Sequence, residues 1–179
     1  MAGIPTPEEC RRLMVQKKLD PAVVAHVEAV AQLGTRVAKA LEKRKQRLRV
    51  ELVTAGCLLH DIGRAKTQGL DHALVGATML RQRHYPESLC KCVERHTGGG
   101  LDLEDAIMLT LPPKDYSPVT LEEKLVCHID NLFDGATRQP VAREIAWLRS
   151  RNLPKVADKI EKLHSEISSL LGMDLDQFE

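Results

Sequence analysis

The stretch that decides the fold is Leu58-Leu59-His60-Asp61-Ile62-Gly63-Arg64. It closes a segment, beginning at Glu51, that is apolar at almost every position, and such a segment is typical of a central, buried helix. A buried imidazole and a buried carboxylate each cost free energy unless a partner satisfies them. Both groups are standard ligands of divalent metals, so one metal ion would satisfy His60 and Asp61 together. The doublet therefore directs the search to further ligands elsewhere in the chain.

Composition limits the classes of protein to consider. The chain has 179 residues, of which 43% are hydrophobic and 28% charged, as expected for one soluble globular domain. The net charge of +1 gives no global attraction for nucleic acid or membrane, and 3% aromatic content argues against a base-stacking platform. No apolar run is long enough to cross a membrane, and residues 1–13 contain no signal-peptide core. The number of cysteines is odd, which fits a reducing compartment. We therefore expect a cytoplasmic protein.

Nearly every segment has helical periodicity, and no strand pattern stands out. Helix start signals occur at Thr6-Pro7, Asp20-Pro21 and Thr120, while Gly63 is interpreted as a helix stop. We therefore predict an all-α, single-domain helical bundle over residues 1–179. Its core is expected at about residues 20–135, with C-terminal helices in 138–171 packed on it.

Four further ionisable residues fall on predicted inner faces or helix ends. His26 lies on the apolar stripe of a long helix, His72 opens a helix, His96 ends one, and Asp130 follows Val126 by one turn. Each alone has an ordinary explanation, as a satisfied core histidine, a polar helix end or a cap. Together with the doublet they form a set of nitrogen and oxygen ligands without a thiolate, which suits a two-metal site.

The chain resembles the HD superfamily of metal-dependent phosphohydrolases, in the type with a His-Asp-Ile-Gly motif. That family's pattern is an isolated histidine on an early helix, the His-Asp doublet and a distant aspartate, matched in order by His26, His60-Asp61 and Asp130. A subset adds two histidines between the doublet and the last aspartate. His72 and His96 match those two positions.

The resemblance covers roughly residues 20–135. The subset includes bacterial diadenosine tetraphosphate hydrolases, but residues 111–131 look more like an archaeal group with relatives fused to tRNA ribose methyltransferases. Two departures stand out: Arg64 replaces the Lys or His that many relatives have, and His128-Ile129 stands where many have alanine before the last aspartate.

The resemblance implies metal-dependent hydrolysis of a phosphate ester or anhydride. One metal is expected on His26, His60, Asp61 and Asp130, and a second, bridged by Asp61, on His72 and His96. Histidine and carboxylate ligands admit Fe, Mn, Co, Ni or Zn, and the metals would lower the pKa of a water that attacks phosphorus. Asp61 and Arg64 are the expected catalytic residues, and Arg64 and Lys66 are the expected phosphate-binding cations.

Three functions remain open. The first is hydrolysis of a nucleotide or dinucleoside polyphosphate. The second is an RNA or tRNA-associated phosphodiesterase, for which the basic residues 43–49 are the distinguishing feature. The third is a nucleotide sensor that binds without turnover. A phosphorylated small molecule is the expected partner, no membrane is expected, and RNA or a second copy of the chain are the alternatives left open.

Overall fold

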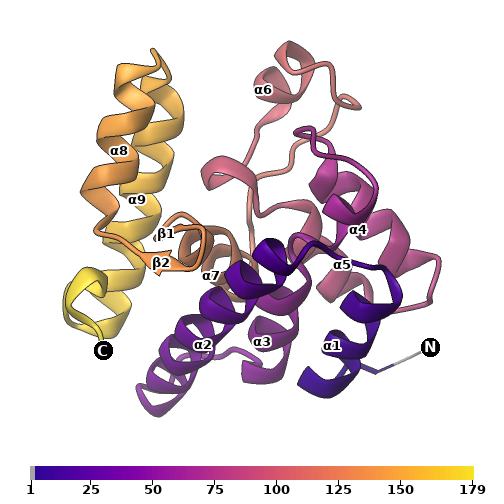
Figure 1. Cartoon of the computed structure of the whole chain (residues 1–179). Coiled ribbons are helices and arrows are strands. Elements are labelled where there is room, and N and C mark those ends of the chain that lie inside the picture. The colour runs from indigo at the N-terminus through magenta and orange to yellow at the C-terminus, as the bar shows by residue number, and fades with distance from the viewer. Residues whose placement is uncertain (1–2) are drawn as a thin grey trace.

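The computed structural model describes residues 3–179, and within that range the fold is all-α, as predicted (Figure 1). The α-helices are α1 Pro7–Gln16, α2 Pro21–Lys43, α3 Val50–Leu59, α4 His72–Arg81, α5 Glu87–Glu94, α6 Leu103–Met108, α7 Leu121–Asp130, α8 Val141–Ser150 and α9 Pro154–Leu171. Short 3₁₀ helices are η1 Ile62–Ala65, η2 Thr97–Gly99 and η3 Leu175–Gln177. The small hairpin β1 Phe133–Asp134 and β2 Thr137–Arg138, which periodicity does not predict, is antiparallel.

Helix α3 is the centre of the bundle, in agreement with its apolar sequence. It packs against α1, α2, α5 and α7, and it is buried on almost all sides. Its neighbours begin at their predicted caps, since Thr6 and Asp20 accept hydrogen bonds from the first turns of α1 and α2. The position of α3 brings its C-terminal end, and with it His60, to the middle of the molecule.

Gly63 has a different role from the predicted one. Helix α3 ends at Leu59, and Gly63 lies inside η1 rather than at a helix stop. A Cβ atom on Gly63 would collide with the backbone carbonyl of His72 and would lie 2.7 Å from the backbone nitrogen of Gly76. The absence of a side chain therefore lets η1 pack directly on the first turn of α4, which brings His72 to the doublet.

The C-terminal region of the chain, after α7, forms a helical hairpin. The β1–β2 hairpin directly follows α7 and leads into α8, and α8 packs along α9 (Figure 1). Helix α9 in turn contacts α2, α7 and η2, so it packs on the elements that surround the centre of the bundle.

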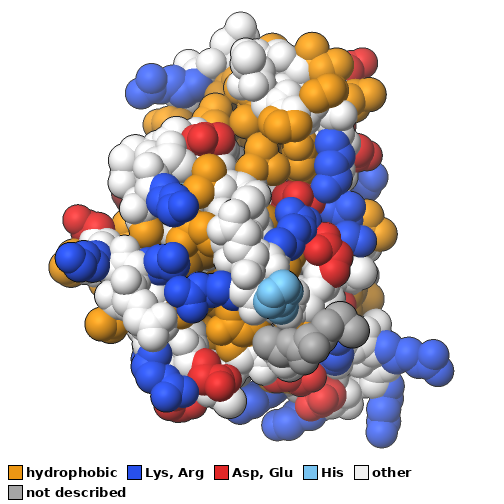
Figure 2. Space-filling model, turned by 90° about the vertical axis from the view of Figure 1, so that its right-hand side faces the viewer, with side chains coloured by type: hydrophobic (Ala, Val, Ile, Leu, Met, Phe, Trp, Pro, Cys, Tyr) orange, Lys and Arg blue, Asp and Glu red, His pale blue; other side chains and the backbone are white. Residues whose placement is uncertain are grey.

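Exposed hydrophobic side chains gather around α6. Leu103, Ile107 and Met108 of this helix are about half exposed or more, and so is the nearby Leu70. Figure 2 shows hydrophobic side chains concentrated at the end of the molecule where α6 lies. Among residues 3–179, no helix has both the length and the apolar character needed to cross a membrane.

Candidate metal centre

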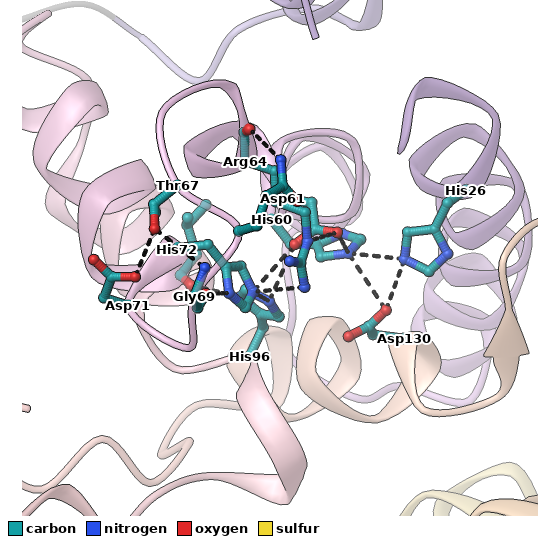
Figure 3. A network of polar contacts seen from close by, with 12 residues as sticks. His26, His60, Asp61, Arg64, Thr67, Gly69, Asp71, His72, His96 and Asp130 are labelled. Carbon is teal, nitrogen blue, oxygen red and sulfur yellow. Dashed lines mark hydrogen bonds and ion pairs between the residues drawn. The ribbon is translucent and has the colours of Figure 1, made fainter. Parts of the chain in front are cut away.

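The six predicted ligands come from five places in the chain and lie together (Figure 3). His26 is in α2, and His60 and Asp61 connect α3 to η1. His72 begins α4, His96 follows α5, and Asp130 ends α7. Apart from His26, the ligands stand at helix ends and turns, where a side chain can project into the space between helices.

The first group consists of His26, His60 and Asp130. The Nε2 atom of His26 lies 2.9 Å from Oδ1 of Asp130 and 3.2 Å from Nε2 of His60. The Nε2 atom of His60 is 3.4 Å from the same Asp130 oxygen. Three ligand atoms thus surround one point, and His60 is fully buried while Asp130 and His26 reach the surface.

The second group consists of Asp61, His72 and His96. Oδ1 of Asp61 lies 3.1 Å from Nε2 of His72 and 3.8 Å from Nε2 of His96, and the two imidazole nitrogens are 3.1 Å apart. The other carboxylate oxygen, Oδ2, is 3.8 Å from Nε2 of His60. Asp61 therefore presents one oxygen to each group and lies between them.

All four histidines are oriented by backbone carbonyls through Nδ1. His60, His72 and His96 each contact the carbonyl three residues earlier, on Cys57, Gly69 and Val93, at 2.7–2.8 Å. A carbonyl oxygen only accepts hydrogen bonds, so each Nδ1 carries the proton and Nε2 is left as the ligand atom. His26 lies inside a helix and instead uses the carbonyl of Gly135 in the β1–β2 hairpin, at 2.7 Å.

This tautomer makes the site require a cation. In the neutral form, the lone pairs on Nε2 of His26 and His60 face each other at 3.2 Å, and those of His72 and His96 at 3.1 Å. Such pairs repel unless a proton or a metal ion lies between them. In addition, Oδ1 of Asp61 is buried and has no hydrogen-bond partner among the described residues. The donor set therefore fits divalent metals with imidazole and carboxylate ligands.

The charges at the site depend on one another. Burial alone would raise the pKa of Asp130 and Asp61, but the positive charge on His60 holds both pKa values below their usual range. Burial disfavours the imidazolium of His60, but the charge and hydrogen bond of Asp130 raise its pKa to about 9. Burial and the charge on His60 lower the pKa of His96 to about 4. The metal-free site therefore holds one proton on the first group.

This proton gives a pH-dependent stability to the metal-free protein. The pKa of His60 is about 9 in the folded state, above the ordinary value of 6.5. The protonated His60 therefore contributes fully to the free energy of unfolding below pH 6.5, and this contribution is lost as the pH rises through 9. We expect urea denaturation in EDTA to show a loss on the order of 3 kcal/mol between these pH values. A metal replaces the proton, so the metal-loaded protein should lack this slope. An equal slope with and without metal would contradict the assignment of His60.

Arg64 lies at the mouth of the site and Lys66 does not. The Nε of Arg64 donates to Oδ2 of Asp61 at 2.8 Å, and Arg64 lines a cavity of about 360 Å³ with His26, Asp61 and Asp130. Lys66 instead lines a separate groove with Asp71 and Thr78. Lys66 is not among the residues that line the cavity of Arg64, and its phosphate-binding role stays a prediction.

A second histidine cluster lies on α7 and α9, where the sequence suggests only isolated histidines. His128 is fully buried, and its Nε2 lies 3.1 Å from Nδ1 of His164. Nε2 of His164 lies 3.1 Å from Oδ1 of Asp174. Both oxygens of the adjacent Asp176 accept from the backbone nitrogen of Val141. These contacts tie the end of the chain to α7 and α8.

Comparison with known proteins identifies the family. Residues 23–133 match the family model of the HD domain, and the chain belongs to this family. The HD domain of the L. monocytogenes phosphodiesterase PgpH has a similar structure, with a TM-score of 0.53 at 18% identity over 91% of this chain and 95% of that one. The family match covers all six candidate ligands.

Three sequence relatives come from archaea. An uncharacterized protein of Methanocaldococcus jannaschii is 44% identical over 152 residues, which are 83% of this chain and 89% of that protein. The tRNA (cytidine(56)-2'-O)-methyltransferases of Thermoplasma volcanium and Picrophilus torridus are 38% and 39% identical over 97% of this chain. The chain spans about half the length of these two methyltransferases, namely 50% and 49%.

Proposed function

We propose that the chain is a metal-dependent phosphohydrolase that cleaves a phosphomonoester, phosphodiester or phosphoanhydride bond, with a nucleotide or dinucleoside polyphosphate as substrate. The observation that carries the proposal is the arrangement of two groups of Nε2 and carboxylate ligand atoms on either side of Asp61. Divalent metals bound there would polarise phosphoryl oxygens and lower the pKa of a coordinated water. Membership of the HD domain family supports this class of reaction.

The residues of the chain have distinct roles in this proposal. The four histidines are oriented by their carbonyl contacts so that each Nε2 faces the site, and metal binding would require only the loss of the proton on the first group. Arg64 already contacts Asp61, and its guanidinium is about one-quarter exposed at the mouth. A guanidinium at this place is suited to hold two oxygens of a phosphate beside the ligands.

Metal content tests the proposal directly. We expect about two equivalents of a transition metal per chain, measured by inductively coupled plasma mass spectrometry on protein purified without chelator. Chelation should abolish hydrolysis of bis(p-nitrophenyl) phosphate, and re-addition of Mn, Fe, Co, Ni or Zn should restore it.

Variants and stoichiometry separate the possible outcomes. The variant His96→Ala should bind about one equivalent, whereas His84→Ala, which changes an exposed histidine remote from the six ligands, should bind two. A wild-type value of one equivalent would demote His72 and His96 to substrate contacts. No metal after reconstitution would contradict the proposal and favour a sensor that binds nucleotide without turnover.

An RNA substrate is the second candidate, favoured by the two tRNA methyltransferases that share this region. The exposed basic residues Lys43, Arg44 and Lys45 lie at the end of α2, while His26 lies near its start. The separation of 17 residues corresponds to about 26 Å along the helix axis. An RNA chain would have to span that distance to reach both the metal centre and the three cations. Its affinity for the protein would then fall steeply as the salt concentration rises. Neutralising the three cations would make this dependence of affinity on salt less steep.

A further inference from the structure

A cavity beside the metal centre has the features of a binding site. It has a volume of about 360 Å³ and lies between the β1–β2 region and one face of α8. Its lining residues are Asn131, Phe133, Asp134, Gln139, Arg143, Glu144 and Trp147. This volume is within the range of small-molecule sites, about 300–1,000 Å³.

The lining is unusual for this chain because it collects aromatic residues. The whole sequence contains one tryptophan, two tyrosines and two phenylalanines, and two of these five, Phe133 and Trp147, line this cavity. Trp147 is 50% exposed although tryptophan is normally well buried. Arg143 and Glu144 precede Trp147 by four and three residues, so each lies one turn of α8 from Trp147 on the same side of the helix.

Trp147 has an ordinary explanation that does not account for the cavity. The guanidinium of Arg151 lies 5.4 Å from the centre of the indole ring, which is a cation–π contact on the surface of α8. That contact accounts for one side of the ring. It does not account for the concentration of amide, carboxylate and aromatic side chains around the same hollow.

The polar groups of the cavity match the edge of a nucleobase. Asn131 and Gln139 carry amides that both donate and accept hydrogen bonds, and Asp134 and Glu144 carry acceptors for ring N–H and amino groups. The Nδ2 of Asn131 donates to the carbonyl of Cys127 at 2.9 Å, which fixes the orientation of its amide. Stacking on an aromatic ring with hydrogen bonds along one edge is how proteins bind single bases.

The cavity adjoins the metal centre, because residues that are neighbours in the sequence line the two. Asn131 lines the cavity and directly follows Asp130, a candidate metal ligand. Asp134 lines the cavity, and the next residue, Gly135, lines the mouth of the metal centre and orients His26. In agreement with this proximity, burial and the negative charges of Asp130 and Asp134 raise the pKa of Glu144.

We propose that this cavity binds the base of a nucleotide whose phosphate lies at the metal centre, with the base stacked on Trp147. The assignment of the phosphate rests on the proposed phosphohydrolase function. The low aromatic content of the sequence is compatible with this site because one base needs only one or two rings. A free nucleotide and a nucleotide within RNA present the same base, and the experiment distinguishes these sources.

The single tryptophan makes the proposal measurable in the intact protein. We expect adenosine and AMP to quench the fluorescence of Trp147, with AMP binding more tightly in the presence of Mn²⁺. Ribose 5-phosphate, which has the phosphate but no base, should leave the fluorescence unchanged. A short single-stranded oligoadenylate that binds at least tenfold more tightly than AMP would assign the base to RNA, and equal or weaker binding would assign it to a free nucleotide.

Calorimetry on variants tests the contribution of the ring. Trp147→Ala should raise the AMP dissociation constant about tenfold, whereas Trp147→Phe, which keeps a stacking surface, should stay within about threefold. Leu153→Ala, a change of another exposed hydrophobic residue outside the cavity, should leave it unchanged. Unchanged AMP affinity in Trp147→Ala, or equal quenching by ribose 5-phosphate, would overturn the proposal.

The two proposals fail separately. Hydrolysis of bis(p-nitrophenyl) phosphate without any quenching by adenosine would remove the base site and leave the phosphohydrolase. Quenching by adenosine without turnover under any metal would support the base site and contradict the phosphohydrolase function. The proposed position of the phosphate at the metal centre would then also be wrong.

Discussion

Replacement of Asp61 by alanine is expected to abolish hydrolysis, with a decrease of at least a thousandfold in kcat. Asp61 presents one oxygen to His60 and the other to His72, so its removal leaves both ligand groups incomplete. The variant should lose the second metal equivalent. Far-UV circular dichroism should show nearly unchanged helix content, because Asp61 lies outside α3 and caps nothing with its side chain.

A conservative variant separates charge from shape at this position. Asp61→Asn keeps the volume but removes the negative charge that divalent metals require, so it should resemble Asp61→Ala in metal content and turnover. His164→Ala, which changes a histidine outside the six ligands, should retain turnover. Substantial hydrolysis by Asp61→Ala would show that the bridging role is wrong.

Gly63→Ala is expected to have the largest effect on stability among single methyl additions. The new Cβ would meet the backbone of α4 at His72 and Gly76, and backbone atoms cannot rotate away as a side chain can. Overpacking of this kind costs about 3 kcal/mol, which corresponds to a decrease of about 10 °C in the melting temperature. Because α4 must move, His72 should lose its position and the second metal should bind more weakly.

Calorimetric melting and metal content of the same preparation check both parts of this prediction. Gly3→Ala is the matched control, since a Cβ there meets no atom within 4 Å. A Gly63→Ala protein that melts like the wild type and binds two metals would show that the contact between η1 and α4 is not needed.

The fold and the identity of the candidate ligands were accessible from local patterns. Apolar periodicity and the caps at Thr6 and Asp20 predict α1 and α2, and the continuous apolar run predicts the central α3. His60 and Asp61 stand out because a buried imidazole and carboxylate need a partner. Periodicity, caps and buried polar residues depend on residues within one or two helical turns, so they can be predicted from the sequence alone.

Long-range geometry was not accessible in this way. Gly135 orients His26 from 109 residues away through its backbone carbonyl. Every residue has such a carbonyl, so no sequence pattern reveals this contact. The local sequence predicts Gly63 as a helix stop, but in the structure its importance lies in a contact with α4. The cavity around Trp147 is assembled by a hairpin of two-residue strands, too short to produce a period-2 pattern.

The sequence by itself determined the all-α class, the main helices and the residue types that suit a metal centre, because helix formation and burial of apolar faces are decided by near neighbours. Only the tertiary structure decided that Asp61 lies between two ligand groups, that Arg64 rather than Lys66 lies at the mouth, and that a cavity with Trp147 adjoins the site. These features depend on how helices distant in sequence pack, and packing is set by the shapes of many side chains at once.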